Sequence, residues 1–165
     1  MSSPVDLFRR LTNGVYVITA SHAGQSNGFT AAWVTQVSFN PLLLMLSVHP
    51  EHATWPLIET SGRFVVNVLG ARQLELARHF GTQSGREVDK LSTVPTMAGG
   101  DGAVVLTHAA AWLACQIDRL VPAGDHVVVI ARVVAGEVLD PATTPLRYLD
   151  TGNMDGSAAL FATHF

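Results

Sequence analysis

Residues 27–54 have the sequence NGFTAAWVTQVSFNPLLLMLSVHPEHAT, and this stretch decides which fold the chain can adopt. Residues 28–39 are rich in β-branched and aromatic side chains, which favour a strand. Pro41 has no backbone N–H and keeps Asn40 out of the helical region, so we expect the chain to bend there. Residues 42–48 are almost continuously apolar, which is typical of a strand covered on both faces. The stretch therefore predicts a strand, a bend and a second strand.

The end of this stretch brings polar groups to the start of a predicted helix. Residues 47–54, SVHPEHAT, carry hydroxyl and imidazole side chains, and residues 54–61 are expected to form a short helix that ends at Gly62. The first N–H groups of a helix have no acceptor within it, so they can bind a phosphate. This corner is the first candidate binding site.

The composition favours one globular domain spanning residues 1–165. Of the 165 residues, 48% are hydrophobic and 14% are charged, which suits a single well-buried core. The net charge of -3 offers no basic surface to a nucleic acid. Because the charged fraction is low, we expect a second subunit to cover some apolar surface, as in a homodimer.

The cysteine content and the amino terminus indicate a cytoplasmic protein. Cys115 is the only cysteine in the sequence, so it cannot form an internal disulfide. The segment MSSPVDLFRR contains no apolar run as long as that of a signal peptide, and no association with a membrane is expected.

The rest of the chain is predicted to consist of strands with short helices between them. A first helix is expected from a Ser3 cap to Gly14. The further expected elements are a strand at 15–20, a hairpin turn at 21–28, a strand at 63–69, a helix at 71–81, a long loop at 82–101, two long strands within 109–139 joined at 121–124, a final strand at 145–150 and a docked apolar tail at 156–165. About seven strands with two or three helices form a mainly β (α+β) architecture, consistent with a closed or split barrel.

Two motifs in loops receive structural interpretations. Residues 24–28 match the G-x-S-x-G pattern of hydrolases, but the residues that follow favour a strand where that motif needs a helix, so a hairpin loop is the better interpretation. His49, Glu51 and His52 have a spacing that could suit a metal. Zinc needs three or four converging ligands, and the sequence places no second cluster, so no metal site is expected. The chain also lacks a glycine-rich dinucleotide motif and a P-loop.

Three residue types could belong either to the core or to a site. Cys115 lies in an apolar strand and is expected to be a core residue. The three tryptophans are expected in the core or an interface, although Trp33 could also flank a planar ring. His126 lies at the mouth of a strand, where its imidazole could contact a ligand or move a proton. The spacing equally allows His126 to cap the hairpin through Asp125.

Five stretches occur together in the order that one family shows. They are NGFTAAWVTQVSFNP followed by LLLMLSV, then SGRFVVNVL, then LARHFG with Asp89-Lys90 downstream, and GDHVVVIARV ahead of PLRYLD. Across residues 8–149 the chain resembles the flavin reductase-like, FMN-binding split-barrel family. The resemblance implies a Greek-key split barrel and a homodimer that binds FMN, with FAD also possible. Many members reduce flavin with NADH or NADPH and supply it to a partner monooxygenase.

The resemblance also assigns residues to a site. Its cofactor-binding segments fall on Thr30, Ala31, Ala32 and Trp33, on Ser47, Val48, His49, His52 and Thr54, and on Gly81, Thr82 and Gln83, with Lys90 as the cation that pairs with the phosphate. His126 matches the family's histidine beside the nicotinamide and the flavin. Because hydride passes directly between the two rings, this histidine would position or polarise them and would not be an obligatory base.

The chain departs from the family pattern at several positions. Leu42 stands where a second proline is common, Ala131 stands where a glycine is frequent, and the end of the segment 145–155 lacks the paired aromatics and glycines seen in many two-component reductases. The last difference leaves two alternatives to a reductase open. One is a flavoredoxin-like carrier that holds FMN without its own NAD(P)H turnover, and the other is a non-enzymatic ligand-binding barrel.

Overall fold

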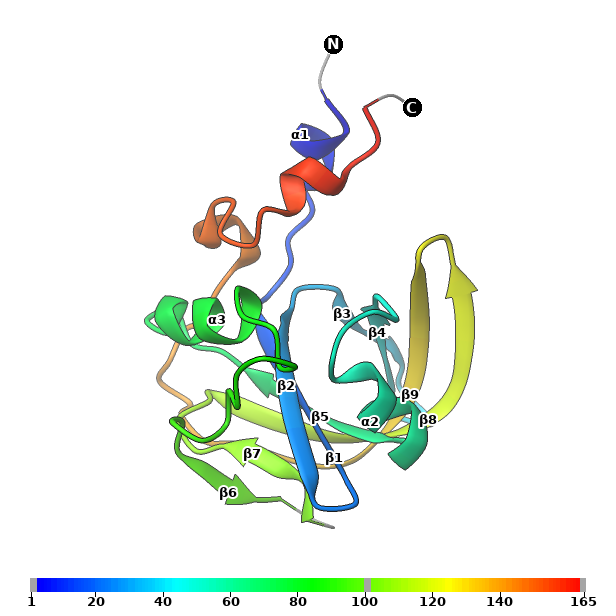
Figure 1. Cartoon of the computed structure of the whole chain (residues 1–165), viewed down its shortest axis with the longest axis vertical. Coiled ribbons are helices and arrows are strands. Elements are labelled where there is room, and N and C mark those ends of the chain that lie inside the picture. Colours follow the sequence, from blue (N-terminus) through cyan, green and yellow to red (C-terminus); the bar gives the residue numbers. More distant parts are fainter. Residues whose placement is uncertain (1–2, 100–101, 164–165) are drawn as a thin grey trace.

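The computed structural model of the chain describes residues 3–99 and 102–163, which are mainly β (Figure 1). Within these residues, seven antiparallel strands form one curved sheet in the order β2-β1-β5-β8-β9-β4-β3. Its strands are β1 (Tyr16–His22), β2 (Gln25–Ala31), β3 (Val34–Ser38), β4 (Leu43–Val48), β5 (Arg63–Val68), β8 (Ala111–Ala123) and β9 (His126–Val138). A small second sheet and the helices are β6 (Thr96–Ala98), β7 (Val104–Leu106), α1 (Pro4–Phe8), α2 (Trp55–Ser61), α3 (Leu74–Gly81), η2 (Tyr148–Thr151) and η3 (Ser157–Leu160).

The single strand expected at residues 28–39 is wrong, because the chain changes sheet partner within it. β2 pairs with β1, whereas β3 pairs with β4 at the opposite end of the strand order. The ladder stops at Ala32 and Trp33, and the Trp33 carbonyl accepts a hydrogen bond from the backbone N–H of Ser47 at 3.0 Å. Strand propensity predicts extended backbone but not its partner. The change of partner leaves residues 31–33 at an opening beside the end of β4.

The long hairpin β8–β9 is confirmed, with its turn slightly later than expected. β8 continues to Ala123, and Gly124, whose φ of 61° suits a glycine, forms the turn with Asp125. His126 is therefore the first residue of β9. Since β4 and β9 are paired up to Val48 and Val127, the next residues along, His49 and His126, are brought together.

The core lies between the curved sheet and α2. Ile18, Leu46, Ile58, Val66 and Val129 come from four strands and α2, and all are fully buried. The expected α2 is confirmed, and it ends at Gly62 with a left-handed φ of 67°. α2 packs against β1 and α3 packs against β2. These contacts hold the loops before α2 and after α3 against the same end of the sheet.

Two expected helix bounds are wrong. The Ser3 cap is confirmed, but α1 ends at Phe8 and not at Gly14. Phe8 and Leu11 remain 55% and 61% exposed, so there is little packing to extend so short a helix. α3 begins at Leu74, three residues later than expected, because residues 71–73 form a turn in which Gln73 Oε1 accepts from the Gly70 N–H.

Two loop and strand assignments are also corrected. The expected loop at 82–101 contains β6, which pairs with β7, and residues 100 and 101 lie outside the described residues. Residues 145–150 make only isolated bridges, from Pro145 to Gly70 and from Arg147 to Gly14, before η2. Pro145 has no N–H to donate, and the ion pair between Arg147 and Asp150 at 2.8 Å spans the η2 turn.

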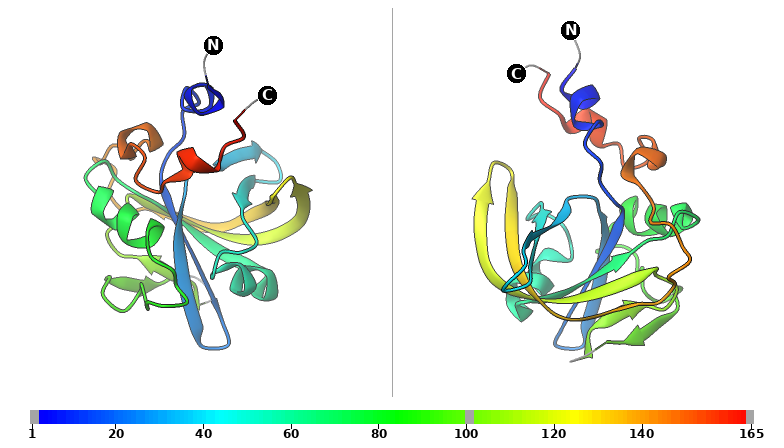
Figure 2. Two further views of the ribbon diagram at one scale, coloured as in Figure 1. Left: turned by 45° about the horizontal axis from the view of Figure 1, so that its top comes forward. Right: turned by 180° about the vertical axis from the view of Figure 1, so that it is seen from behind.

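The apolar tail packs against the first helix. The Phe161 and Phe8 rings lie 5.6 Å apart between centroids. Figure 2 shows the first and last described segments side by side, beyond the end of the main sheet. The expected docking is thus confirmed at Phe161, whereas Ala162 and Thr163 are exposed and the last two residues lie outside the described part of the chain.

We expect Leu46→Ala to lower the free energy of unfolding by about 2–5 kcal/mol, because Leu46 is fully buried in the core and its removal leaves a cavity. Leu149→Ala is the matched control, since Leu149 is 61% exposed and should change stability by less than about 1 kcal/mol. Urea unfolding at one protein concentration measures both. Equal losses would contradict the assigned core.

Candidate functional site

A groove of about 440 Å³ opens where β2 gives way to β3, and we call it the main groove. It is lined by the ends of β2, β4 and β9 and by residues between Tyr148 and Phe161. The predicted residues that line it are Thr30, Ala31, Ala32, Trp33, Ser47, His49, His52, Gly81 and His126. Positions from four separate segments of the sequence are thus brought to one place.

A smaller pocket of about 70 Å³ continues from one end of the main groove, and we call it the small pocket. The two share Phe29, Thr30, His52 and Gly81. The predicted residues that line the small pocket are Thr30, His52, Thr54, Gly81, Gln83 and Lys90. Together the two hollows form one elongated site.

Two predicted residues line neither hollow. Val48 is 1% exposed and packs in the core, as alternation along β4 requires when Ser47 faces the groove. Thr82 is exposed, and its hydroxyl donates to the carbonyl of Arg78 at 2.8 Å. The structure therefore offers no side-chain route from either residue to a ligand in the groove.

His126 combines both interpretations that its spacing allowed. Its Nδ1 lies 2.6 Å from a carboxylate oxygen of Asp125, which orients the ring. The ring also contacts Trp33, at 4.9 Å between centroids, and meets His49 edge-on at 5.3 Å. The hydrogen bond to His126 lowers the pKa of Asp125, which is therefore ionised near neutral pH. With a proton on Nδ1 facing this carboxylate, Nε2 of a neutral ring can accept a hydrogen bond.

His52 forms the wall between the main groove and the small pocket. Its ring stacks on Phe29 at 4.5 Å, with the planes 22° apart. Loss of solvation against this ring lowers the pKa of His52, and the nearby His49 and Lys90 lower it further. His52 is consequently neutral near pH 7 and acts as a flat polar surface.

Lys90 lies buried in the small pocket. Lys90 is 3% exposed, and its Nζ donates hydrogen bonds to the carbonyls of Phe80 at 3.0 Å and of Gln83 at 3.2 Å. Burial lowers the pKa of Lys90 to about 8. An ammonium has three donors, and two are used here. No carboxylate pairs with Lys90 in the described residues, so a positive charge is held ready for an anion.

Two sets of contacts around the site were not predicted from the sequence. Arg86 donates from Nη2 to the carbonyl of Glu51 at 2.8 Å, which ties the loop after α3 to the loop before α2. Above the main groove, the Tyr148 hydroxyl lies 2.7 Å from the Ser157 hydroxyl and 3.1 Å from a carboxylate oxygen of Asp155. The apolar tail predicted docking, but nothing in its pattern indicated that it covers a site.

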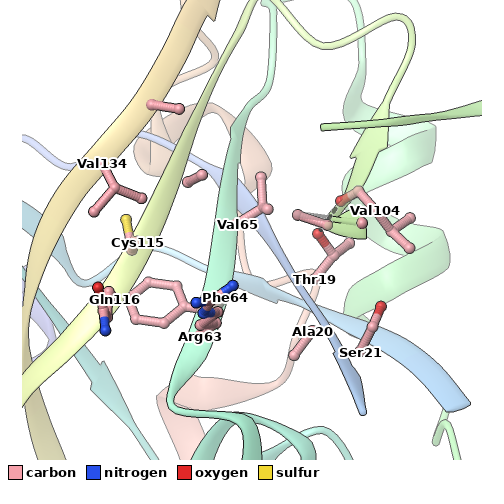
Figure 3. Close-up of a pocket in the computed structure, with 14 residues that line it drawn as sticks. Thr19, Ala20, Ser21, Arg63, Phe64, Val65, Val104, Cys115, Gln116 and Val134 are labelled. Atoms are coloured by element: carbon pink, nitrogen blue, oxygen red, sulfur yellow. Dashed lines mark hydrogen bonds between the residues drawn. The ribbon is translucent and has the colours of Figure 1, made fainter. Parts of the chain in front are cut away.

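A second cavity of about 350 Å³ lies on the other side of the main sheet, and it has no predicted site residue in its lining (Figure 3). It is bounded by β1, β5, β8 and β9 and by the start of β7, where the Thr19 hydroxyl donates to the Val104 carbonyl. Size alone therefore does not identify the site. The convergence of imidazoles and an indole in the main groove, with an ammonium in the adjoining small pocket, distinguishes the candidate site from this cavity.

Cys115 and Ser26 lie where structural residues are expected. Cys115 is buried, and burial raises the pKa of its thiol to about 12, so it is the core residue expected. Ser26 lies in β2, within a hairpin and not at the head of a helix. Among residues 3–99 and 102–163, His49, Glu51 and His52 belong to no grouping of three or more possible metal ligands. Over the same residues, every helix is too short or too polar to cross a membrane.

The chain is similar to several known proteins. It is 37% identical over 134 residues to a probable flavin reductase of Rhizobium meliloti, covering 80% of this chain and 42% of that protein. It is 33% identical to diflavin flavoprotein A 1 of Synechocystis sp., covering 87% of this chain and 26% of that protein. The structure of the Streptomyces globisporus C-1027 NADH:FAD oxidoreductase SgcE6 superposes with a TM-score of 0.79 at 31% identity, covering 86% of this chain and 84% of that one.

The similarities differ in how much of each protein they cover. The chain spans less than half the length of the curated relatives it matches, from 25% to 42%. One family match, however, covers nearly the whole chain, over residues 8–157, and includes every strand that lines the two hollows. On this evidence the chain belongs to the family of the flavin reductase like domain.

Proposed function

We propose that this protein binds FMN and reduces flavin with NADH or NADPH. The observation that carries the proposal is the polarity of the elongated site. A buried ammonium without a carboxylate partner, that of Lys90, lies at one end, and an indole and imidazoles lie at the other. A flavin mononucleotide has the same polarity, with a phosphate at one end and a planar ring at the other.

The residues present fit such a ligand. Gly81 lines both hollows, and a Cβ there would lie 3.2 Å from Thr30 Cβ, so glycine keeps the passage between them open. The free N–H of the Lys90 ammonium supplies a charge-assisted hydrogen bond to a phosphate dianion. At about 70 Å³ the small pocket suits a single phosphate group, which favours FMN, whereas FAD would need a path out of it.

His126 and Trp33 are proposed to orient the reacting rings. When bound, the flavin supplies the acceptor for hydride from the nicotinamide. The side chain of His126 lines the main groove and is 22% exposed, and its contact with Asp125 through Nδ1 orients the ring. The covering segment around Tyr148 limits access of water to this end of the site. No proton transfer by His126 is required for the hydride step.

Several broader predictions accompany the proposal. The curved sheet, whose edge strands β2 and β3 are consecutive in the chain, supports a Greek-key split barrel. A homodimer is supported by exposed apolar side chains, among them Val37 in β3, Phe39 just after β3 and Val121 in β8. A single domain over residues 1–165, a cytoplasmic location and a monooxygenase that receives reduced flavin remain predictions.

One preparation separates the proposal from its two rivals. The purified chain should be yellow or should quench the fluorescence of added FMN, and NADH or NADPH should be consumed in the presence of flavin. A colourless protein that quenches no flavin would favour the non-enzymatic barrel. A yellow protein that neither dinucleotide bleaches would favour the electron carrier.

We expect Lys90→Met to weaken FMN binding by about tenfold or more while riboflavin, which lacks the phosphate, is little affected. Methionine keeps an unbranched stem in the buried position. Fluorescence titration measures both ligands, and a melting curve checks that the variant is folded. Equal losses for FMN and riboflavin would remove the phosphate role.

The preference for FMN over riboflavin should also depend on pH. Because the pKa of Lys90 is lowered to about 8, the side chain in the ligand-free protein is mostly charged at about pH 7 and mostly neutral at about pH 9. A neutral amine attracts a phosphate dianion less, so the ratio of the two affinities should fall as pH rises through this range. The ratio in Lys90→Met should stay flat. A slope shared by both proteins would assign the dependence to another group.

We expect His126→Ala to slow flavin reduction by about 10- to 100-fold with flavin still bound, because the ring no longer orients the reacting pair. Stopped-flow absorbance follows the bleaching of the flavin. His22→Ala is the matched control, since His22 is an exposed histidine at the end of β1 and lines neither hollow. Unchanged reduction in His126→Ala would make that residue structural.

A further inference from the structure

The segment of residues 83–90 carries Lys90 to the small pocket, and mainly side chains attach it to the rest of the protein. Within the described residues, its backbone–backbone hydrogen bonds are made inside the segment or just beyond it, such as those from the N–H groups of Glu87 and Val88 to the Ser84 carbonyl at 3.1 Å. The position of Lys90 therefore depends on contacts made by side chains.

His79, in the last turn of α3, makes one of these contacts. Its Nε2 lies 2.7 Å from the backbone carbonyl oxygen of Lys90. A carbonyl oxygen can only accept a hydrogen bond, so Nε2 carries the proton, and Nδ1 of a neutral ring is then an acceptor. Nδ1 faces the side-chain amide nitrogen of Gln83, a donor, at 3.3 Å. Both nitrogens of the His79 ring are thus engaged by the segment that carries Lys90.

The residue after His79 holds the other end of Lys90. The backbone carbonyl of Phe80 accepts from Nζ at 3.0 Å, and the ammonium lies 5.8 Å from the centre of the Phe80 ring. The rings of His79 and Phe80 pack edge-on at 5.0 Å. Two consecutive residues of α3 therefore fix the backbone and the ammonium of Lys90. A long side chain that is fixed at both ends is ordered before a ligand arrives.

His79 itself is not among the described residues that line the two hollows, whereas Lys90 lines the small pocket. The segment between them lies close against β2, because a Cβ at Gly85 would overlap the side chain of Asn27. A change in the backbone position of Lys90 would consequently move the ammonium relative to the pocket. Any effect of His79 on a bound phosphate must pass through Lys90.

We propose that His79 is a positioning residue that holds Lys90 in place for the phosphate and so sets the preference of the site for a phosphorylated flavin. The proposal rests on the proposed function for the place of the phosphate, beside Lys90. Riboflavin has no phosphate and gains nothing from this arrangement. His79 therefore contributes to the affinity for FMN and not to the affinity for riboflavin.

His79→Leu and His79→Gln test this role. Leucine removes both ring nitrogens, whereas the glutamine amide can still donate to the Lys90 carbonyl. We expect His79→Leu to lower the ratio of FMN affinity to riboflavin affinity by about threefold to tenfold, the range that the loss of one hydrogen bond gives, and His79→Gln to keep most of the ratio. Fluorescence titration measures both ligands.

Two further variants serve as controls. His108→Leu should leave the ratio unchanged, since His108 is exposed and is not among the residues that line the two hollows. In the Lys90→Met background, His79→Leu should change the ratio no further, because the ammonium through which it acts is already absent. A melting curve for each variant checks that it is folded.

Nuclear magnetic resonance of protein labelled with [ε-13C]lysine provides a readout that needs no ligand, because Lys90 is the only lysine in the sequence. Burial lowers the pKa of Lys90 to about 8, and a side chain released to water would titrate closer to the ordinary value of 10.5. The carbon signal should therefore titrate at clearly higher pH in His79→Leu than in the wild type, and His79→Gln should behave like the wild type.

The outcomes separate this inference from the proposed function. An unchanged ratio in His79→Leu, equal losses for FMN and riboflavin, or an unchanged titration of Lys90 would overturn the role of His79. A ratio in His79→Gln as low as that in His79→Leu would also overturn it, since the effect would then come from packing of the ring. A wild-type chain that binds FMN no better than riboflavin would contradict the proposed function, and the titration of Lys90 would then decide whether His79 positions the ammonium.

Discussion

The pairing of β4 with β9 is the constraint on which the site depends. Its register joins Val48 to Val127, so the residues just beyond the ladder, His49 and His126, must meet. The β8–β9 turn then holds Asp125 against His126, and the exit of the chain from β2 brings Trp33 to the same edge. A shift of one residue in this register would turn every groove-facing side chain of β4 into the core.

The parts of the fold that were predictable from the sequence are those governed by neighbouring residues. The apolar run of β4, the left-handed Gly62 after α2 and the β8–β9 hairpin each follow from patterns within a few positions. The break at Ala32 did not, because residues on both sides favour extended backbone and only the partner strand changes. The strand predicted at residues 145–150 was wrong for a similar reason, since the bridges of this segment are made to residues far away in the sequence.

The same division applies to the candidate site. A resemblance in sequence brought together the residues of three segments, and the structure places most of them around two joined hollows. Its positional alignment could not tell which side chains face inward, so Val48 was included although it faces the core. The burial of Lys90 was also unpredictable, because a polar loop normally leaves a lysine in water, and here two backbone carbonyls hold it.

The position of those carbonyls gives Lys90 a structural role in addition to the proposed binding role, so substitutions of Lys90 should affect stability as well as ligand binding. Phe80 belongs to the last turn of α3, whose carbonyls lack partners within the helix, and Lys90 caps one of them with a favourable charge. The residue proposed to recognise a ligand therefore also terminates a helix. A mutational scan that measures only the cellular abundance of the protein would therefore class Lys90 with the core residues. Its role in binding the ligand would become visible only when the same variants are compared at different cofactor concentrations.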